Sequence, residues 1–390
     1  MAPISQIEKD AIADQTLKFL SKTPYACSTL TPLSGGTTNF VYRGSLASPS
    51  PAHAKHGSLV TTVIIKRATD FVSANQDFKL DPSRSAFEEV MLNAVDGFPP
   101  ITTLDGLVIK APKLYFFDRE TNTQVLEDIP GSTDLLKLLN TLSFPAASSI
   151  GRALGSWLKA FHDWTSEPEQ TALRTELAKN KSMQELKSKI TYEMFIPVLE
   201  RNFPEILERH QEILEEVRAA VAEELTREDK TDLGESWSIV HGDFWMGNVL
   251  LPDPTPTSDN LPNSTLYIID FEFAQLSHRS LDLGQIVGDI YERDLLPSSP
   301  RASPLSLPLL QAFIAGYGPL SEDLAYRTAI HAGIHLIGVL TRRDPSTAWL
   351  WPREEVEGLM SVAVCWIVKG WQRDGGWFGD SVLARLFIRT

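Results

Sequence analysis

The chain has 390 residues, of which 43% are hydrophobic, so it is long enough to bury a full core, more naturally in two lobes than in one. Its 50 acidic residues outnumber its 36 basic residues, and the formal net charge is −14. This balance disfavours nucleic acid or an anionic membrane as the main partner. It favours a cationic or neutral small molecule.

Targeting signals and cysteine usage point to the inside of the cell. The sequence has no run of about 18 apolar residues, the length that spans a bilayer. Its first ten residues carry early charges and no long apolar core, unlike a signal peptide. Cys27 and Cys365 lie far apart without metal-ligand spacing, which is typical of reduced thiols. We therefore expect a cytoplasmic protein without a membrane segment, either a monomer or a homodimer.

A glycine turn follows a first amphipathic helix, which the apolar spacing predicts between residues 7 and 20. The turn leads into an alternating strand that ends near residue 44. Glycines let the backbone approach a phosphate closely, and small polar side chains add hydrogen-bond donors. The full G-x-G-x-x-G pattern is absent, so an ordinary hairpin is the alternative interpretation. The candidate phosphate-binding residues are Gly35, Gly36, Thr37 and Asn39.

A strand lysine and two helix glutamates come next. Residues 62–66 are β-branched and end in Lys66, and residues 85–92 form a helix candidate that carries Glu88 and Glu89. Each of these charges alone is also compatible with a solvated surface position.

An apolar strand then runs into two acids and a Pro-Gly pair, the pattern expected of a hinge between lobes. Backbone groups around Glu127 to Ile129 would there pair with adenine; an ordinary strand exit is the alternative. After this point the apolar spacing is mostly helical, for example over residues 150–161, which end at His162.

Two polar clusters between short apolar runs are the most informative feature of the chain. The first is His-Gly-Asp at residues 241–243 with an asparagine five residues after the aspartate, and the second is Asp-Phe-Glu at residues 270–272. Phosphoryl transfer needs a carboxylate that orients or accepts the proton of the attacking hydroxyl, and oxygen ligands that hold Mg²⁺ against phosphates. Two solvated turns are the alternative. The clusters supply Asp243, Asn248, Asp270 and Glu272.

The order of these motifs resembles the aminoglycoside phosphotransferase and choline kinase superfamily, from the glycine turn near residue 33 to the acidic stretch that ends near residue 288. The resemblance implies an α+β, bilobal, protein-kinase-like fold with a small N-lobe built on an antiparallel sheet and a larger, mostly helical C-lobe. It places the N-lobe at residues 1–127 and the C-lobe at residues 128–390.

The resemblance also implies a role for each motif residue. Asp243 would be the catalytic base or hydroxyl orienter, Asn248 and Asp270 would hold Mg²⁺, and Glu272 would be an additional ligand. In the family the strand lysine contacts the α- and β-phosphates and a helix glutamate holds it, which here implies Lys66 paired with Glu88 rather than with Glu89. His241 would fix the loop, His162 would be structural, and Asp282 would be a cap-like or loop-anchoring acid.

On the acceptor side the chain is most similar to the methylthioribose kinase branch and the related fungal hydroxytryptamine kinase, through Trp245, the Asp-x-Glu pair and the Ser-Leu-Asp-Leu-Gly stretch at residues 280–284. Asn248 and Phe271 depart from the serine and proline usual in methylthioribose kinases, which argues against methylthioribose itself. Arg342 and Arg343 resemble the paired arginines that bind substrate there; a solvated helix end is the alternative. The other pocket candidates are His331, His335, Trp349 and Trp351.

The sequence therefore predicts an ATP- and Mg²⁺-dependent phosphotransferase that acts on a hydroxyl of a small molecule. A protein kinase is less consistent with it, because the loop has His-Gly-Asp rather than His-Arg-Asp and no Ala-Pro-Glu follows. A catalytically weak nucleotide-binding regulator with the same fold is the other alternative.

Overall fold

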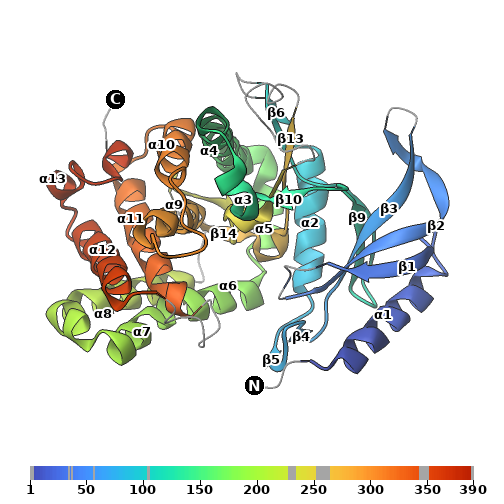
Figure 1. Ribbon diagram of the computed structural model, residues 1–390, viewed down its shortest axis with the longest axis horizontal. Helices are drawn as coiled ribbons and strands as arrows, with labels where there is room; N and C mark the ends of the chain where they lie inside the picture. Colours follow the sequence, from blue (N-terminus) through green and yellow to red (C-terminus); the bar gives the residue numbers. More distant parts are fainter. Residues whose placement is uncertain are drawn as a thin grey trace. The chain divides into compact units, whose positions relative to one another are not determined.

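The computed structural model describes residues 4–33, 36, 38–55, 58–102, 106–226, 234–251, 264–341 and 351–387 (Figure 1). The chain divides into two compact units. Unit 1 comprises Met1–Gly97 and Ala111–Pro130, and unit 2 comprises Phe98–Lys110 and Gly131–Thr390. The single boundary after residue 127 that the family resemblance implies stays a prediction.

Unit 1 is built on a five-stranded antiparallel sheet with strand order β1-β2-β3-β9-β8. A capping box between Ser5 and Glu8 starts its first helix. The strands are β1 (Cys27–Pro32), β2 (Phe40–Lys55), β3 (Ser58–Arg67), β8 (Leu114–Asp118) and β9 (Thr123–Glu127), with a small hairpin of β4 (Phe71–Val72) and β5 (Asn75–Lys79); the helices are α1 (Gln6–Leu20) and α2 (Arg84–Asp96).

The two faces of β3 contact different parts of unit 1. Val63 and Ile65 are fully buried and pack in one cluster with Leu20 of α1 and Tyr42 of β2. Because side chains alternate along a strand, Lys66 points to the opposite face, where it meets α2. The core of unit 1 thus fixes the direction of the strand lysine.

Unit 2 combines a small mixed sheet, a two-stranded ribbon and many helices (Figure 1). The sheet has the order β10-β12-β13-β7-β6, in which only the β13–β7 pair is parallel, and β11 pairs with β14. The strands are β6 (Ile101–Thr102), β7 (Val108–Lys110), β10 (Thr133–Asp134), β11 (Trp237–Val240), β12 (Val249–Leu251), β13 (Thr265–Ile268) and β14 (Gln275–His278).

The helices of unit 2 occur both before and after these strands in the sequence. They are α3 (Leu135–Leu138), α4 (Phe144–Ser166), α5 (Thr171–Leu177), α6 (Lys181–Ser188), α7 (Phe195–Asn202), α8 (Pro204–Thr226), α9 (Ser280–Leu295), α10 (Ser306–Tyr317), α11 (Glu322–Ile337), α12 (Arg353–Trp371) and α13 (Gly375–Phe378), with a π-helical turn at Lys189–Glu193 and 3₁₀ turns at Met246–Asn248 and Phe271–Phe273. Shorter 3₁₀ turns occur at Leu139–Thr141, Pro168–Gln170, Gly338–Leu340 and Ala384–Leu386.

Helices α9 and α11 pack closely against each other. Gly284 and Gly288 of α9 face α11, where an added Cβ would lie 2.6 Å from His331 and 2.9 Å from His335, respectively. These glycines let α11 approach α9 closely and bury both histidines.

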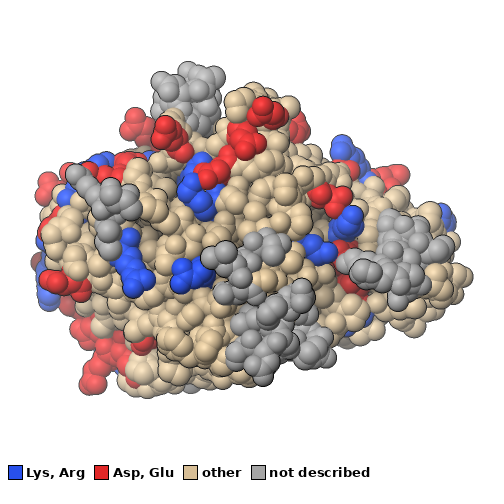
Figure 2. All heavy atoms as spheres, turned by 90° about the horizontal axis from the view of Figure 1, so that it is seen from above, with Lys and Arg blue, Asp and Glu red and all other residues tan. Residues whose placement is uncertain are grey.

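None of the described helices is both long enough and apolar enough to cross a membrane. On the face shown in Figure 2, the acidic and basic side chains of the described residues are interspersed. The net negative charge is therefore not gathered into one field on that face.

Candidate active site

The loop with the His-Gly-Asp motif connects two strands that belong to different sheets. β11 leads into the loop and pairs with β14, whereas β12 leaves it and pairs with β13. Short strands therefore flank the His-Gly-Asp motif where the sequence has its apolar runs. Residues 252–263, which link β12 to β13, lie outside the described residues.

Asp282, the third residue of α9, anchors the backbone of this loop. Its Oδ2 accepts the backbone N–H of His241 at 2.8 Å and its Oδ1 accepts that of Gly242 at 2.9 Å. Nε2 of His162 lies 3.0 Å from Oδ2, and the Asp282 side chain is fully buried. Burial alone would raise the pKa of Asp282, but these hydrogen bonds and the adjacent imidazoles lower it. Of the two predicted roles, cap-like or loop-anchoring, Asp282 has the loop-anchoring one, and the N-cap of α9 has no side-chain hydrogen bond.

His241 is held in one tautomer. Its Nε2 lies 3.0 Å from the carbonyl oxygen of Ile269, which requires the proton on Nε2. Its Nδ1 then accepts the backbone N–H of Asp243 at 3.3 Å. Burial lowers the pKa of His241, so the ring is neutral near pH 7. These bonds agree with the prediction that His241 fixes the loop rather than takes a proton.

Gly242 is needed for the loop to form, and this can be tested. It has a φ of +80°, and an added Cβ would lie 2.2 Å from the Phe273 carbonyl oxygen. We expect Gly242→Ala to lower the free energy of unfolding by about 2–5 kcal/mol through backbone strain and steric clash. Gly234 is the matched control, because it has a φ of +75° and open space around its Cβ position. Gly234→Ala should lower the free energy of unfolding through backbone strain alone, by about 1–2 kcal/mol. Equal losses in urea unfolding would contradict the packing explanation.

The Asp243 carboxylate is held by three side chains. Gln285 of α9 donates its Nε2 to Oδ1 at 2.6 Å, and Asn248 donates its Nδ2 to Oδ2 at 3.2 Å and to the Asp243 carbonyl oxygen at 2.9 Å. Nζ of Lys187 from α6 lies 3.7 Å from Oδ1. The Asp243 side chain is 31% exposed, so it stays reachable from solvent.

Lys187 and Gln285 are the site residues that sequence reasoning missed. Gln285 had a signal, because Asp282, Gln285 and Asp289 recur at positions i, i+3 and i+7 on one face of α9. Asp289 completes the row by accepting the backbone N–H of Met246 at 3.1 Å. Lys187 belongs to a short helix without a motif, and nothing in its sequence context indicated a contact with the loop.

The Asp-Phe-Glu cluster lies beside Asn248. The backbone N–H of Ile269 donates to the Asn248 carbonyl oxygen at 3.0 Å. The next residue, Asp270, has the left-handed conformation with φ 70° and ψ 61°, and a 3₁₀ turn follows. Asn180 donates to the carbonyl oxygens of Glu272 at 3.1 Å and Ala274 at 3.0 Å, which ties the turn down from the segment before α6. The turn therefore has a fixed conformation next to the loop.

Among the predicted residues of unit 1, Lys66 and Glu88 form a buried ion pair at 2.8 Å. Glu89 instead pairs with the exposed Arg119 at 2.6 Å. The choice of Glu88 over Glu89 as the partner of the strand lysine therefore agrees with the structure.

Two further predicted residues of unit 1 take part in local contacts. Oδ1 of Asn39 accepts a hydrogen bond from the buried Arg84 at 2.8 Å. The Glu127 N–H donates to the Lys113 carbonyl oxygen at 2.8 Å, and a Glu127 carboxylate oxygen accepts the Lys113 N–H at 3.2 Å. Gly36 and Ile129 lie at exposed and half-buried positions, respectively. Their roles toward a nucleotide stay predictions.

The predicted acceptor residues divide into three groups. Trp245 is half-buried, with its ring over Gly247, where an added Cβ would meet the ring at 2.4 Å. His335 and Trp351 are buried. The predicted acceptor residues Arg342, Arg343 and Trp349 lie outside the described residues, as do Gly35 and Thr37, which were predicted to contact phosphate.

A cavity of about 890 Å³ lies among α8, α11 and the end of α12. It adjoins a small cavity of about 30 Å³ that Lys187 lines, and the two share six wall residues. Lys187, in the wall of the small cavity, has its Nζ 3.7 Å from Oδ1 of Asp243. The shared wall residues are Tyr192, Val221, Glu224, Trp237, Ser280 and Arg327.

His331 is a buried polar group in the wall of the larger cavity. Tyr192 Oη lies 2.5 Å from its Nδ1, and burial raises the pKa of Tyr192, which therefore stays a donor. Nε2 of His331 has no hydrogen-bond partner among the described residues. With Nδ1 as acceptor, Nε2 carries the proton and can donate it.

The charge state of His331 predicts a pH dependence of stability. Burial, and secondly the positive charge of Lys187, lower the pKa of His331 to about 3. Its ordinary pKa is about 6.5, so the unfolded chain binds a proton between these values and the native chain does not. Stability from this residue is full above pH 6.5 and falls by about 1.4 kcal/mol per pH unit below it.

We expect His331→Gln to flatten this acid dependence by that amount, as measured by urea unfolding at pH 7, 6 and 5. The other buried histidines are present in both proteins and cancel in the comparison. Parallel curves for wild type and variant would contradict the neutral state of His331.

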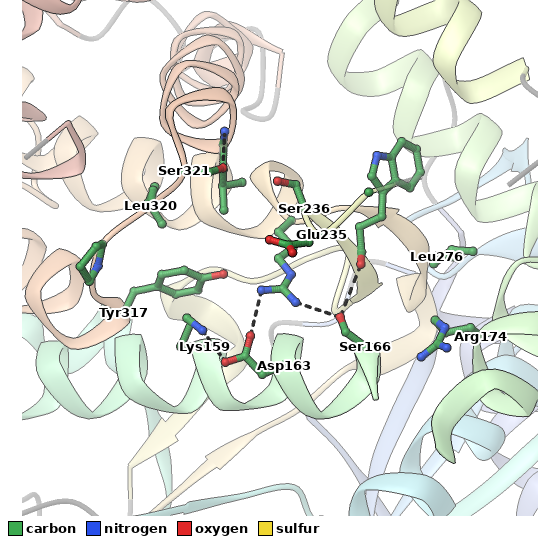
Figure 3. A pocket seen from close by; sticks show the side chains of 15 residues that line it. Lys159, Asp163, Ser166, Arg174, Glu235, Ser236, Leu276, Tyr317, Leu320 and Ser321 are labelled. Carbon is green, nitrogen blue, oxygen red and sulfur yellow. Dashed lines mark hydrogen bonds and ion pairs between the residues drawn. The ribbon is translucent and has the colours of Figure 1, made fainter. Parts of the chain in front are cut away.

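A second cavity of about 690 Å³ lies elsewhere in unit 2, between α4 and the segments around Glu235 and Leu320 (Figure 3). Three of its charged side chains contact one another within the wall. Lys159 contacts Asp163, and Arg279 binds Asp163 at 2.9 Å and Ser166 at 2.8 Å. None of the predicted site residues lines it, so its size alone does not connect it with the His-Gly-Asp loop.

Comparisons with known proteins agree with this arrangement. The profile of the Phosphotransferase enzyme family (APH) matches residues 104–327. The chain is 30% identical over 98% of both chains to the phosphotransferase FrzJ of a Cladobotryum species. It is 24% identical over 77% of both chains to the 4-hydroxytryptamine kinase of Psilocybe cubensis.

Among solved structures, aminoglycoside 2′-phosphotransferase-IIIa in its GDP complex is similar with a TM-score of 0.50 and 14% identity, over 90% of this chain and 97% of that chain. This likeness concerns the fold, and it confirms the predicted α+β, protein-kinase-like class. Together with the profile match over more than half of the sequence, the comparisons establish the family. This chain belongs to the phosphotransferase enzyme family.

Proposed function

We propose that the protein transfers the γ-phosphate of ATP to a hydroxyl group of a small molecule, with Asp243 as the base that orients the hydroxyl. The observation that carries this proposal is the arrangement of the Asp243 carboxylate. It lies on a loop whose backbone Asp282 anchors, its two oxygens have different partners, and it is still partly exposed. Such a pre-positioned acceptor of a proton is what phosphoryl transfer to a hydroxyl requires.

Asn248 and Asp270 would hold Mg²⁺, with Glu272 as an additional ligand. The donor set supports this, because amide and carboxylate oxygens are the ligands that Mg²⁺ prefers. The Asn248 amide nitrogen is directed at Asp243, so its amide oxygen is the atom left to act as a ligand. When bound, Mg²⁺ would neutralise negative charge on the phosphates.

The protein residues then have distinct tasks. Asp243 accepts the hydroxyl proton while the acceptor oxygen forms its bond to the γ-phosphorus, and the electron pair of the broken P–O bond leaves with ADP. Lys66, held by Glu88, would bind the α- and β-phosphates. Gly35, Gly36, Thr37 and Asn39 would contact the phosphates, and the backbone from Glu127 to Ile129 would contact the base.

The acceptor would lie in the 890 Å³ cavity with its hydroxyl toward Asp243. Trp237, Tyr326 and Trp371 give this cavity aromatic walls, and Glu224, Asp323 and Arg327 add charged groups. These walls favour a planar or apolar molecule that carries a few polar groups. Relatives named for a hydroxylated indole amine fit the same description.

An acceptor screen coupled to ADP release tests the proposal. The panel should contain 4-hydroxytryptamine, other hydroxylated indoles, sugars, amino alcohols and aminoglycosides, each with ATP or GTP and with or without Mg²⁺. We expect one class to raise ADP release above the acceptor-free rate only with Mg²⁺ present. ATP binding without turnover on any acceptor would favour a regulator with this fold, and transfer to a peptide would favour a protein kinase.

A further inference from the structure

Lys187 is a buried lysine for which neither the family motifs nor the proposed mechanism gives a role. It lies near the C-terminal end of α6, and its side chain is only 8% exposed. Burying an ammonium group costs free energy unless charged or polar groups compensate it. The contacts of Lys187 therefore indicate why a lysine occupies this position.

Those contacts lead to Asp243 by two routes. Directly, Nζ lies 3.7 Å from Oδ1 of Asp243. Indirectly, Nζ donates to Oε1 of Gln285 at 2.5 Å, and Nε2 of Gln285 donates to the same Oδ1 at 2.6 Å. The lysine thus fixes which way the Gln285 amide faces, because an ammonium group can only donate and a carboxylate can only accept.

The structure also fixes Lys187 itself. Its ammonium group lies 5.8 Å from the ring centre of Phe273, at cation–π distance. Asn180, just before α6, binds the carbonyl oxygens on either side of Phe273. Helix α6 is therefore attached to the acidic turn, and Lys187 is attached to both the turn and the His-Gly-Asp loop.

We propose that Lys187 and Gln285 are positioning residues that set the orientation of the Asp243 carboxylate; this rests on the proposed function. The terminal torsion of an aspartate is broad, so a carboxylate without fixed partners samples several orientations. Holding Oδ1 from one side keeps the carboxylate plane constant as the acceptor hydroxyl approaches.

The expected kinetic signature is a loss in kcat without a change in nucleotide binding. A misplacement of about 1 Å at a reacting group costs about 10²-fold in rate. We therefore expect Lys187→Met to lower kcat about 10²-fold, with the KM for ATP and the melting temperature close to wild type. Lys187→Arg, which keeps the charge, should recover part of this loss.

Gln285→Glu is the second variant. It keeps an acceptor for Lys187 but replaces the N–H that binds Asp243 with a second carboxylate, so kcat should fall, and the melting temperature measured beside it reports any loss of folding. Lys181→Met is the matched control, because Lys181 is an exposed lysine of the same helix that contacts a glutamine, Gln184, at 3.3 Å. Its kcat should equal that of wild type.

The decisive comparison uses Asp243→Asn. If Lys187 acts through Asp243, Lys187→Met should have no further effect in the Asp243→Asn background, because residues that act as one unit are not additive. Independent, multiplicative losses would overturn the proposal. So would a wild-type kcat in Lys187→Met, or a raised acceptor KM at constant kcat, which would make Lys187 an acceptor-binding residue.

A crystal structure of Lys187→Met tests the same inference without turnover. We expect the Asp243 carboxylate or the Gln285 amide to have turned relative to wild type, and unchanged orientations would overturn the inference. Absence of phosphoryl transfer by the wild-type protein would count against the proposed function instead, so the two failures are distinguishable.

Discussion

Asp243→Asn is expected to lower kcat by about 10³-fold, because an amide cannot accept the hydroxyl proton. The amide remains nearly isosteric and can still accept from Gln285, so the loop should keep its conformation. ATP affinity, measured by calorimetry, should stay close to wild type, because Asp243 is proposed to act on the acceptor and not on the nucleotide.

The control for this variant is Glu235→Gln. Glu235 is an exposed acid just before β11, and removing its charge should leave both kcat and ATP affinity unchanged. Asp243→Asn with wild-type turnover on the true acceptor would remove the assignment of Asp243.

Asp282→Ala should have the largest effect on stability. The change leaves the N–H groups of His241 and Gly242 and the ring of His162 without their shared acceptor in a fully buried place. Breaking a buried, hydrogen-bonded charge in this way costs about 3–5 kcal/mol. We expect a clear drop in the urea midpoint together with loss of activity, since the backbone before Asp243 loses its anchor.

Asp294→Ala is the control for this variant, because Asp294 is an exposed acid on the same helix. The pH dependence of the free energy of unfolding at acid pH provides a second test of Asp282. The lowered pKa of Asp282 contributes stability above the unfolded pKa, and this is lost as the pH falls through the folded pKa. The free energy of unfolding should therefore fall less steeply with decreasing pH in Asp282→Ala than in wild type. A loss in Asp282→Ala no greater than in Asp294→Ala would show that the loop does not depend on this anchor.

Much of the fold was predictable because local patterns determine it. The alternation of β3 separates Val63 and Ile65 from Lys66, and the apolar spacing of residues 85–92 turns Glu88 inward and leaves Glu89 to pair with Arg119. Each of these outcomes follows from the period of a single strand or helix.

The environment of Asp243 was less predictable, because it is made by residues distant in sequence. Lys187 precedes Asp243 by more than fifty residues and lies in a helix of eight residues, too short for a periodic signal. Its contact with Gln285 depends on how α6 and α9 pack, which no local pattern encodes. Gln285 could have been predicted from the sequence, because it continues the helical row that begins at Asp282.

Mass spectrometry of the acceptor, after incubation with protein, ATP and Mg²⁺, shows whether the Asp243 site moves a phosphoryl group from ATP to a hydroxyl. We expect an acceptor that carries one added phosphate on oxygen with wild-type protein, and none above background with Asp243→Asn. A phosphorylated product formed equally well by both proteins, or ADP formed with no phosphorylated acceptor from any class in the panel, would contradict it.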